Sequence, residues 1–308
     1  MLDIIPDIHG QAEKLTSRLA SLGYRERGGA WRNDDPRRQV VFLGDFIDRG
    51  PRNGEVISIV RRMIDAGSAH AVMGNHELNA IHFHTLAPQN GMPLRRHTSK
   101  NVDQHASFLD EFPVGSSAAM EAIDWMKSLP LFLEFDGFRF VHACWDEGAI
   151  SRLRTSTKDG RLSEDQIIGA SSRKDPLYDP VETITKGPEA KLPEGYSFHD
   201  KGNHERTEVR LKWWKGDART WRDIAISVPD QTELPDANLP TDVAQSVYPE
   251  DADPVFFGHY WLTGKPEQQA HNALCLDYSA GKDDGPLAAY IISEPGEPID
   301  LANLVIDQ

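Results

Sequence analysis

The chain has 308 residues, of which 39% are hydrophobic and 26% charged, so it is long enough and apolar enough to bury a sizeable core. Its formal net charge of −15 disfavours general nucleic-acid binding, because an anionic surface repels phosphate backbones. Two cysteines, Cys144 and Cys275, cannot build a disulfide framework, and no apolar run has the length of a leader or a membrane span. We therefore expect a cytoplasmic protein with no membrane partner.

The first quarter of the chain alternates short apolar strands with amphipathic helices. Strands are expected at 2–5, 38–45 and 70–75, and helices at 11–23 and 55–67. This β-α-β-α-β order predicts parallel strands with right-handed crossovers. In such sheets ligands gather beyond the carboxyl ends of the strands.

The remainder is less regular. Residues 78–118 are interpreted as a helix running into an irregular excursion, 119–130 as a helix, and 131–143 as a hairpin that turns at Asp136-Gly137. Residues from about 145 to 250 lack a strong core signal, so we expect a lid-like insertion without its own core inside a single domain of residues 1–308. Further strands are expected at 254–261, 272–280 and 286–293.

Polar clusters follow five of these strands. PDIHG, GDFIDRG and GNHE follow the first three, and VHA and GHY follow two later ones. If these strand ends share a rim, the side chains that converge there are Asp7, His9, Asp45, Asp48, Asn75, His76, His142 and His259. Oxygen and nitrogen donors without thiolates suit Mn²⁺, Fe or Zn²⁺, and their number suits two ions. Asp45 is then placed to bridge the ions, and Asp48 to orient a histidine.

The series P-D-I-H-G, G-D-F-I-D-R-G, G-N-H-E, then His142 and His259, resembles the calcineurin-like metallophosphoesterases, in particular their phosphoprotein phosphatase branch. The segment LDYSAGKDDGPLAAYII is also similar to the ending of bacterial symmetrical diadenosine tetraphosphatases. The resemblance implies an α/β (α+β) fold of two mixed β-sheets packed as a sandwich and flanked by helices.

The resemblance also implies roles for the clustered residues. Asp7, His9 and Asp45 would hold one ion, and the other would be held by Asp45, Asn75, His142 and His259. A hydroxide bridging the ions would attack phosphorus, and His76, aimed by Asp48, would protonate the leaving group. Arg49 would grip phosphate oxygens as a planar fork, and Arg210 is a candidate for a second phosphate contact.

Two departures from the family pattern concern the cleft. Pro6 replaces a glycine, which should be harmless because Asp7 and His9 remain. HACW, at 142–145, replaces the usual H-G-G or H-A-G, so Trp145 is expected to narrow the cleft and contact substrate.

Each motif alone has an ordinary structural interpretation. PDIHG is compatible with a helix N-cap, and GNHE is compatible with a turn. The pair His82 and His84 indicates a solvent-facing helix end more than an additional metal site. Their joint occurrence favours a dinuclear site.

The leading functional hypothesis is an Mn²⁺-dependent phosphomonoesterase, with phosphoserine or phosphothreonine proteins as one substrate class. A diadenosine polyphosphate hydrolase is the alternative within the same chemistry, so the partner is a phosphorylated protein or a nucleotide. A metal-bearing interaction scaffold is the non-catalytic alternative. The sequence does not indicate the oligomeric state.

Overall fold

The first of two large sheets joins strands from both ends of the chain. The computed structural model describes residues 1–308 except 201–202, 242, 244–246, 283 and 307–308. The sheet has the order β16 (Leu304–Val305), β15 (Ala289–Ile292), β1 (Leu2–Ile5), β4 (Gln39–Phe42), β5 (Ala69–Ala71). As predicted, β1, β4 and β5 run parallel. β15 is antiparallel to β1, and β16 is antiparallel to β15, so the sheet is mixed.

The second sheet is built from the predicted hairpin and two of the late strands. Its order is β14 (Ala273–Cys275), β13 (Val255–Phe257), β7 (Phe138–Val141), β6 (Phe132–Phe135). β14, β13 and β7 run parallel, whereas β6 is antiparallel to β7. The hairpin turns at Asp136-Gly137, where both residues have positive φ, as the tight turn requires.

The two sheets pack face to face. Alternate residues of their strands point inward and form one buried cluster: Leu2, Ile4, Val41, Leu43, Phe138, Phe140, Phe256, Leu274, Leu276, Tyr290, Ile292 and Ile299. This period-2 pattern leaves the intervening residues, such as Ile5 and Phe42, to pack under helices on the outside. The predicted sandwich of two mixed sheets flanked by helices is confirmed.

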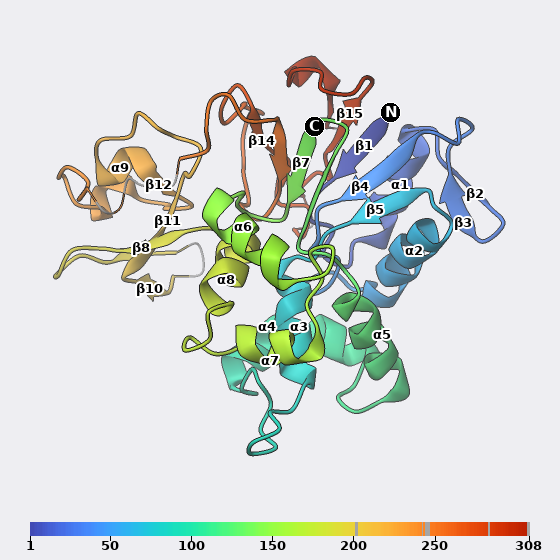
Figure 1. Cartoon of the computed structure of the whole chain (residues 1–308), viewed down its shortest axis with the longest axis horizontal. Coiled ribbons are helices and arrows are strands. Elements are labelled where there is room, and N and C mark those ends of the chain that lie inside the picture. The colour runs from blue at the N-terminus through green and yellow to red at the C-terminus, as the bar shows by residue number, and fades with distance from the viewer. Residues whose placement is uncertain (201–202, 242, 244–246, 283, 307–308) are drawn as a thin grey trace.

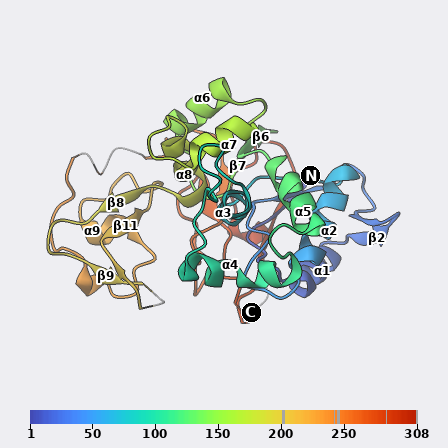
Figure 2. The ribbon, with the colours of Figure 1, turned by 90° about the horizontal axis from the view of Figure 1, so that it is seen from below.

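Helices cover the outer faces of the sandwich (Figure 1). α1 and α2 pack their apolar stripes against the first sheet, and α3, α4 and α5 lie beyond the strand ends on one side of it (Figures 1 and 2). Their bounds are α1 (Ala12–Ser21), α2 (Asn53–Asp65), α3 (Asn75–His84), α4 (Ser99–Glu111) and α5 (Ser117–Lys127). A hairpin of β2 (Arg25–Arg27) and β3 (Ala30–Arg32), which the sequence did not suggest, follows α1.

The segment expected to be an irregular excursion contains the regular helix α4. Thr98 caps its first turn by accepting a hydrogen bond from the backbone N–H of Asn101. The buried residues of α4 are His105 and Phe108. Because one of the two is a histidine, the apolar periodicity that usually marks such a helix is weak.

The insertion predicted at about 145–250 has two parts. Its helices α6 (Glu147–Ser156), α7 (Glu164–Ala170) and α8 (Tyr178–Lys186) share the main core through Ile150, Ile167 and Ile184. A projecting module follows, seen at the left of Figure 1, with the elements β8 (Glu189–Lys191), β9 (Phe198–His199), β10 (Glu205–Arg206), β11 (Glu208–Leu211), α9 (Trp221–Ile224) and β12 (Ala225–Ile226).

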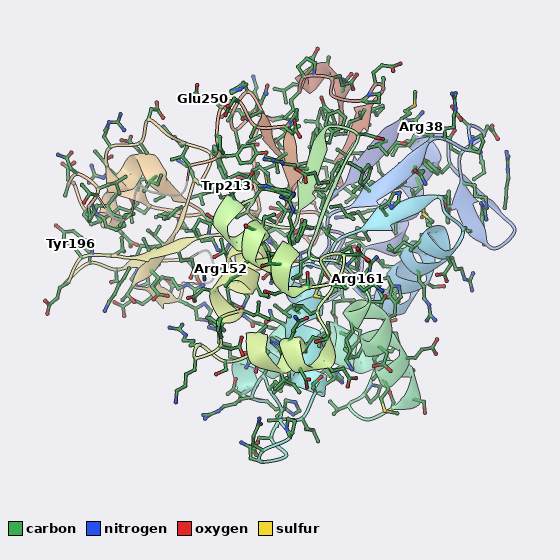
Figure 3. All side chains as sticks on the ribbon, in the orientation of Figure 1. Arg38, Arg152, Arg161, Tyr196, Trp213 and Glu250 are labelled. Carbon is green, nitrogen blue, oxygen red and sulfur yellow. The ribbon has the colours of Figure 1, made fainter. Side chains whose placement is uncertain are left out.

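The expectation that the insertion lacks its own core is wrong for this module. Ten buried residues form a separate cluster there, among them Leu192, Phe198, Val209 and Trp221. These residues are scattered over very short strands and loops, so no apolar run in the sequence indicates a core. Trp213 lies where the module meets the body (Figure 3), and its Nε1–H donates to the carbonyl of Ala143. Residues 201–202, 242 and 244–246 of the insertion lie outside the described residues.

The two cysteines are free and buried, as expected for small apolar side chains. Among the described residues, no helix combines the length and apolar character that crossing a bilayer requires.

Candidate metal and phosphate site

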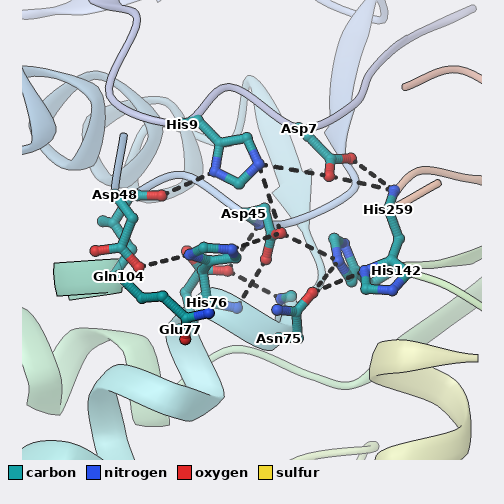
Figure 4. A network of polar contacts seen from close by, with 12 residues as sticks. Asp7, His9, Asp45, Asp48, Asn75, His76, Glu77, Gln104, His142 and His259 are labelled. Carbon is teal, nitrogen blue, oxygen red and sulfur yellow. Dashed lines mark hydrogen bonds and ion pairs between the residues drawn. The ribbon is translucent and has the colours of Figure 1, made fainter. Parts of the chain in front are cut away.

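The polar clusters of five strands meet at one place (Figure 4). Asp7 and His9 follow β1, and Asp45, Asp48 and Arg49 follow β4. After β5, Asn75 and His76 form the first residues of α3; His142 follows β7 and His259 follows β13. Because β1, β4 and β5 are parallel, as are β7 and β13, their carboxyl ends share one rim.

The loops that carry these residues are strained and tightly packed. Five of the predicted site residues adopt positive φ: His9, Asp45, Asp48, Arg49 and His259. Such conformations cost roughly 1–3 kcal/mol each and persist only where the surroundings enforce them. Gly44 explains part of the enforcement, since a Cβ there would lie 2.5 Å from the backbone nitrogen of Gly74. Gly44 and Gly74 thus allow the loops after β4 and β5 to lie close to each other.

Asp45 lies at the centre of the cluster. Its Oδ2 is 3.8 Å from His9 Nε2, 3.9 Å from His76 Nε2 and 3.4 Å from His142 Nε2. Its Oδ1 accepts the backbone N–H of His76 at the start of α3, at 2.8 Å. Burial would raise the pKa of Asp45, but the imidazoles of His142 and His76 hold it well below its usual value. Asp45 is therefore an ionised carboxylate that faces three imidazoles from three separate segments of the chain.

His9 presents an unshared electron pair to two carboxylates. Its Nδ1–H donates to the carbonyl of Ile47 at 3.0 Å, and burial lowers the pKa of His9 to about 3, so the ring is neutral. Its Nε2 lies 3.9 Å from Asp7 Oδ2 and 3.8 Å from Asp45 Oδ2. Among the described residues this buried nitrogen has no hydrogen-bond partner. Three acceptors facing one another fit a bound cation.

A second group of ligand atoms surrounds the amide of Asn75. Asn75 Oδ1 lies 2.8 Å from His259 Nδ1 and 3.1 Å from His142 Nε2. The other nitrogen of His142, Nδ1, donates to the carbonyl of Leu43 at 2.8 Å. Burial would lower the pKa of His142, but the Asp45 and Asp7 carboxylates raise it to about 10. A protonated His142 balances these carboxylates as a bound cation would; once Nε2 loses its proton, this group of oxygen and nitrogen donors fits a second cation, with Asp45 common to both groups.

Buried negative charge supports the same interpretation. Asp7, Asp45 and Asp277 are each at most 1% exposed. Burial raises the pKa of Asp7, and the charges of Asp277 and Asp45 raise it further. Asp277 Oδ2 and Oδ1 also accept the backbone N–H groups of Trp261 and Ser279, which fixes the loop after His259. Carboxylates this deeply buried are expected to coordinate a metal or to be paired.

His76 and Asp48 form the expected pair. His76 Nδ1 lies 2.5 Å from Asp48 Oδ2, and its Nε2 faces Asp45. Burial would lower the pKa of His76, yet the Asp45 and Asp48 carboxylates outweigh it and raise the pKa above the ordinary value. Burial would raise the pKa of Asp48, but hydrogen bonds from His105 and His76 lower it to about 2. Asp48 is therefore an ionised acceptor for both imidazoles.

Glu77, the last residue of GNHE, holds the loop after β4. Its carboxylate accepts the backbone N–H groups of Asp45 and Phe46, both at 2.8 Å, and that of Gly74 at 3.0 Å. Glu77 is recognisable in the sequence as the last residue of GNHE, but nothing in the sequence indicated this role.

Arg49 lies at the exposed rim of the site. Its guanidinium stacks on the ring of Trp261, 3.6 Å from the ring centroid, and Trp261 in turn lies 5.5 Å from the His9 ring. Stacking leaves the edge of the guanidinium, with its N–H donors, available to an anion.

The prediction from HACW that Trp145 narrows the cleft and contacts substrate is wrong. Trp145 is 2% exposed, packs edge-to-face on Phe132 and donates its Nε1–H to Glu147, so it belongs to the core. The position that follows His142 by three residues turns inward as α6 begins, and Trp261 supplies the aromatic ring beside the site.

Arg210 belongs to the projecting module. It sits on β11, and its Nε lies 3.5 Å from Glu189 Oε1. Burial lowers the pKa of His259, and the positive charge of Arg210 lowers it further. The module therefore places a cation within electrostatic reach of His259.

The donor set at the strand ends of two packed mixed sheets is that of a metallophosphoesterase. The family model described as calcineurin-like phosphoesterase matches residues 2–260, and the chain belongs to that family.

Curated relatives match shorter stretches of the chain. It is 40% identical over 75 residues to the asymmetrical bis(5'-nucleosyl)-tetraphosphatase PrpE of Oceanobacillus iheyensis, covering 24% of this chain and 30% of that protein. It is 36% identical over 108 residues to the symmetrical bis(5'-nucleosyl)-tetraphosphatase of Janthinobacterium sp. (strain Marseille), covering 35% of this chain and 34% of that protein. The matches thus span about a third of the length of these relatives.

Solved structures share the fold. The crystal structure of a cold-active protein-tyrosine phosphatase of a psychrophilic Shewanella species covers 96% of this chain and 76% of that chain, with a TM-score of 0.50 and 17% sequence identity. At this identity the likeness concerns the fold alone.

Proposed function

We propose that this chain hydrolyses phosphate monoesters while it holds two divalent cations, with Mn²⁺ as the physiological metal. The observation that carries the proposal is the position of Asp45, whose Oδ2 lies between the two groups of ligand atoms. Asp7, His9 and Asp45 would hold one cation, and the second would be held by Asp45, Asn75, His142 and His259. When bound, the cations would supply Lewis acidity toward the phosphate oxygens and activate water at neutral pH.

His76 acts as the general acid in this proposal. The Asp48 carboxylate accepts its Nδ1–H, so the ring presents Nε2 to the site, and that nitrogen lies 3.9 Å from Asp45 Oδ2. The raised pKa of His76 favours the protonated ring, which is the form that can donate to the leaving oxygen. Positioned proton transfer of this kind contributes about 10²–10⁴-fold to the rate.

Arginines orient the substrate phosphate in this proposal. Arg49, stacked on Trp261, offers a planar pair of donors that matches two phosphate oxygens. Arg210 would supply a second positive charge, because, beyond the effect of burial, its charge acts on His259 strongly enough to lower the pKa of that imidazole. Together they would favour a dianionic phosphate over a neutral ester.

Hydrolysis of dinucleoside polyphosphates is the second candidate. It is favoured by the two bis(5'-nucleosyl)-tetraphosphatases described above, which are 40% and 36% identical to this chain over the matched stretches. Proteins phosphorylated on serine or threonine are a further substrate class for the same site. Two free, buried thiols support a reducing cytoplasm as the place of action.

A substrate panel tests these alternatives. Purified protein supplemented with Mn²⁺ is assayed on p-nitrophenyl phosphate, a phosphoserine peptide, a mononucleotide and a symmetrical dinucleoside tetraphosphate, and its metal content is measured. The proposal expects two ions per chain and release of inorganic phosphate from the monoesters. Turnover of the dinucleotide alone would replace it with the second candidate.

Full Mn²⁺ occupancy with no hydrolysis of any ester would contradict both catalytic candidates. That result would favour a metal-bearing interaction scaffold.

A further inference from the structure

His105 contacts the one carboxylate that orients His76. His105 lies on α4, is 5% exposed, and places its Nδ1 2.7 Å from Asp48 Oδ1. The other oxygen of Asp48, Oδ2, faces His76 Nδ1 at 2.5 Å. The Asp48 carboxylate is therefore held between two imidazoles, one on each oxygen. Resting on the proposed function, we propose that His105 is a positioning residue that fixes Asp48 and thereby aims the general acid His76.

The geometry explains why a second partner matters. A carboxylate bound through one oxygen can still rotate about its terminal bond, and rotation would turn His76 with it. Because an ionised carboxylate only accepts hydrogen bonds, Asp48 requires Nδ1–H on both rings. The bond from His105 thus fixes the plane of the carboxylate, and the carboxylate fixes the tautomer and direction of His76.

The His105 ring is itself held from several sides. It stacks on Phe108 with 4.7 Å between centroids and 16° between planes, and it lies 5.2 Å from the ring of Phe83. Its second nitrogen, Nε2, is 3.3 Å from His84 Nε2. Because these contacts fix the His105 ring, the ring orients the Asp48 carboxylate and does not rotate with it.

The backbone of Asp48 is held by a residue of α2 that α4 in turn supports. Asn53 Oδ1 accepts the backbone N–H of Asp48 at 2.6 Å, and Asp48 has a left-handed φ of 71°. Glu111, at the end of α4, accepts hydrogen bonds from the backbone and side-chain N–H groups of Asn53. α4 therefore contacts the side chain of Asp48 directly through His105 and supports its main chain indirectly, through Asn53 at the start of α2.

Substitutions separate positioning from packing. His105→Phe keeps an aromatic ring against Phe108 but removes the donor, whereas His105→Asn restores an N–H near the place of Nδ1. His97→Phe is the matched control, because His97 stacks on Phe83 at 3.7 Å in the same aromatic cluster. The assay compares kcat for p-nitrophenyl phosphate, a good leaving group, with kcat for an alkyl phosphate, a poor one.

We expect His105→Phe to lower kcat for the alkyl phosphate by about 10–100-fold, with KM and metal content unchanged and a much smaller loss on p-nitrophenyl phosphate. His105→Asn should recover most of the loss, and His97→Phe should leave the ratio of the two kcat values unchanged. Equal ratios in His105→Phe and His97→Phe, or no recovery in His105→Asn, would overturn the inference.

A measurement on the unsubstituted protein gives an independent test. Long-range ¹H–¹⁵N spectra of the Zn²⁺-loaded protein should show Nδ1–H on both His105 and His76, and a bare Nδ1 on His105 would refute the contact. If the unsubstituted protein hydrolyses neither ester, the proposed function fails, and the spectra still decide whether His105 holds Asp48.

Discussion

At the scale of single residues, the candidate site depends on one oxygen atom. Imidazoles from three loops lie 3.4–3.9 Å from Asp45 Oδ2, on both sides of it. An amide oxygen at that position would keep the shape of the side chain but lose the negative charge that the two proposed cations would share. The charge of Asp45, more than its hydrogen bonds, is therefore what the two ligand groups have in common.

Asp45→Asn should lower the metal content from two ions per chain to one or fewer. Hydrolysis should fall by at least about 10²–10³-fold, the loss that follows removal of one preorganised electrostatic group. Metal content is measured by mass spectrometry after dialysis against Mn²⁺. Asp3→Asn, which alters a buried carboxylate at the opposite end of β1, is the control and should keep both ions. Retention of two ions in Asp45→Asn would refute the bridging role.

Arg49 owes its suitability for phosphate to shape as well as charge. Its flat guanidinium lies 3.6 Å from the centre of the Trp261 ring. Arg49→Lys keeps the positive charge but loses both the stacking and the two-pronged donor, so KM should rise by about tenfold with a smaller change in kcat. Steady-state kinetics on p-nitrophenyl phosphate check this, with Arg52→Lys, an exposed arginine paired with Glu55, as control. Unchanged kinetics in Arg49→Lys would remove Arg49 from the site.

At the scale of elements, helix α3 connects the site to the helices of the insertion. Its first residues, Asn75 and His76, belong to the candidate site, and His82 two turns later donates Nε2–H to the carbonyl of Ile167 on α7 at 3.0 Å. His82, one of the two histidines considered for an additional metal site, therefore joins two helices. Its partner in that motif, His84, contacts His105.

The burial of His82 predicts a pH dependence of stability. Burial lowers the pKa of His82 to about 4 from 6.5, so between these values the unfolded chain binds a proton that the native state rejects. This contribution to the free energy of unfolding is fully present above pH 6.5 and is lost as pH falls toward 4. His82→Gln keeps an N–H donor for Ile167 but does not titrate. Urea denaturation gives the free energy of unfolding at pH 7 and at pH 4.5. Between these values it should fall by about 2–3 kcal/mol more in the unsubstituted protein than in His82→Gln. Equal decreases would contradict the lowered pKa of His82.

The elements that sequence could predict are those whose pattern is local. The strand 2–5, the part of the expected strand 254–261 that forms β13 (Val255–Phe257), and the hairpin at Asp136-Gly137 carry apolar runs or turn residues that need no knowledge of their neighbours. α4 was missed because its buried face includes His105, whose burial makes sense only once Asp48 lies opposite. The module of β8–β12 was missed for the same reason, since its core residues meet only in three dimensions.

The site divides in a similar way. Asp7, His9, Asp45, Asn75, His142 and His259 were predictable because each follows a strand in a recognisable motif, and the structure brings them together. Asp277 was visible in LDYSAG but without a role, and Trp261 was passed over for Trp145 because nothing local tells which ring turns inward. No sequence signal pointed to His105.

At the scale of the whole molecule, the candidate site and a stabilising polar network lie at opposite ends of the strands. The ligand cluster occupies the carboxyl ends of the parallel strands, while the amino end of β1 holds a different polar network. There Asp3, fully buried, accepts two hydrogen bonds from Arg38, both at 2.7 Å, and one from Tyr24 at 2.8 Å. This network links β1 to the segments before and after the β2–β3 hairpin.

Asp3 should therefore matter for stability and not for chemistry. Asp3→Asn keeps the shape of the side chain but leaves the guanidinium of Arg38, only 19% exposed, without its carboxylate. Removing one partner of a buried ion pair costs about 3–5 kcal/mol, and access of Arg38 to solvent favours the lower end of that range. Asp35→Asn is the matched control, because Asp35 pairs with Arg37 at the surface, where solvent screens an ion pair and leaves it little effect on stability. Urea denaturation should show a clearly larger loss for Asp3→Asn, with metal content and kcat unchanged. Equal losses in the two variants would mean that the network at the amino end of β1 stabilises no more than a surface pair.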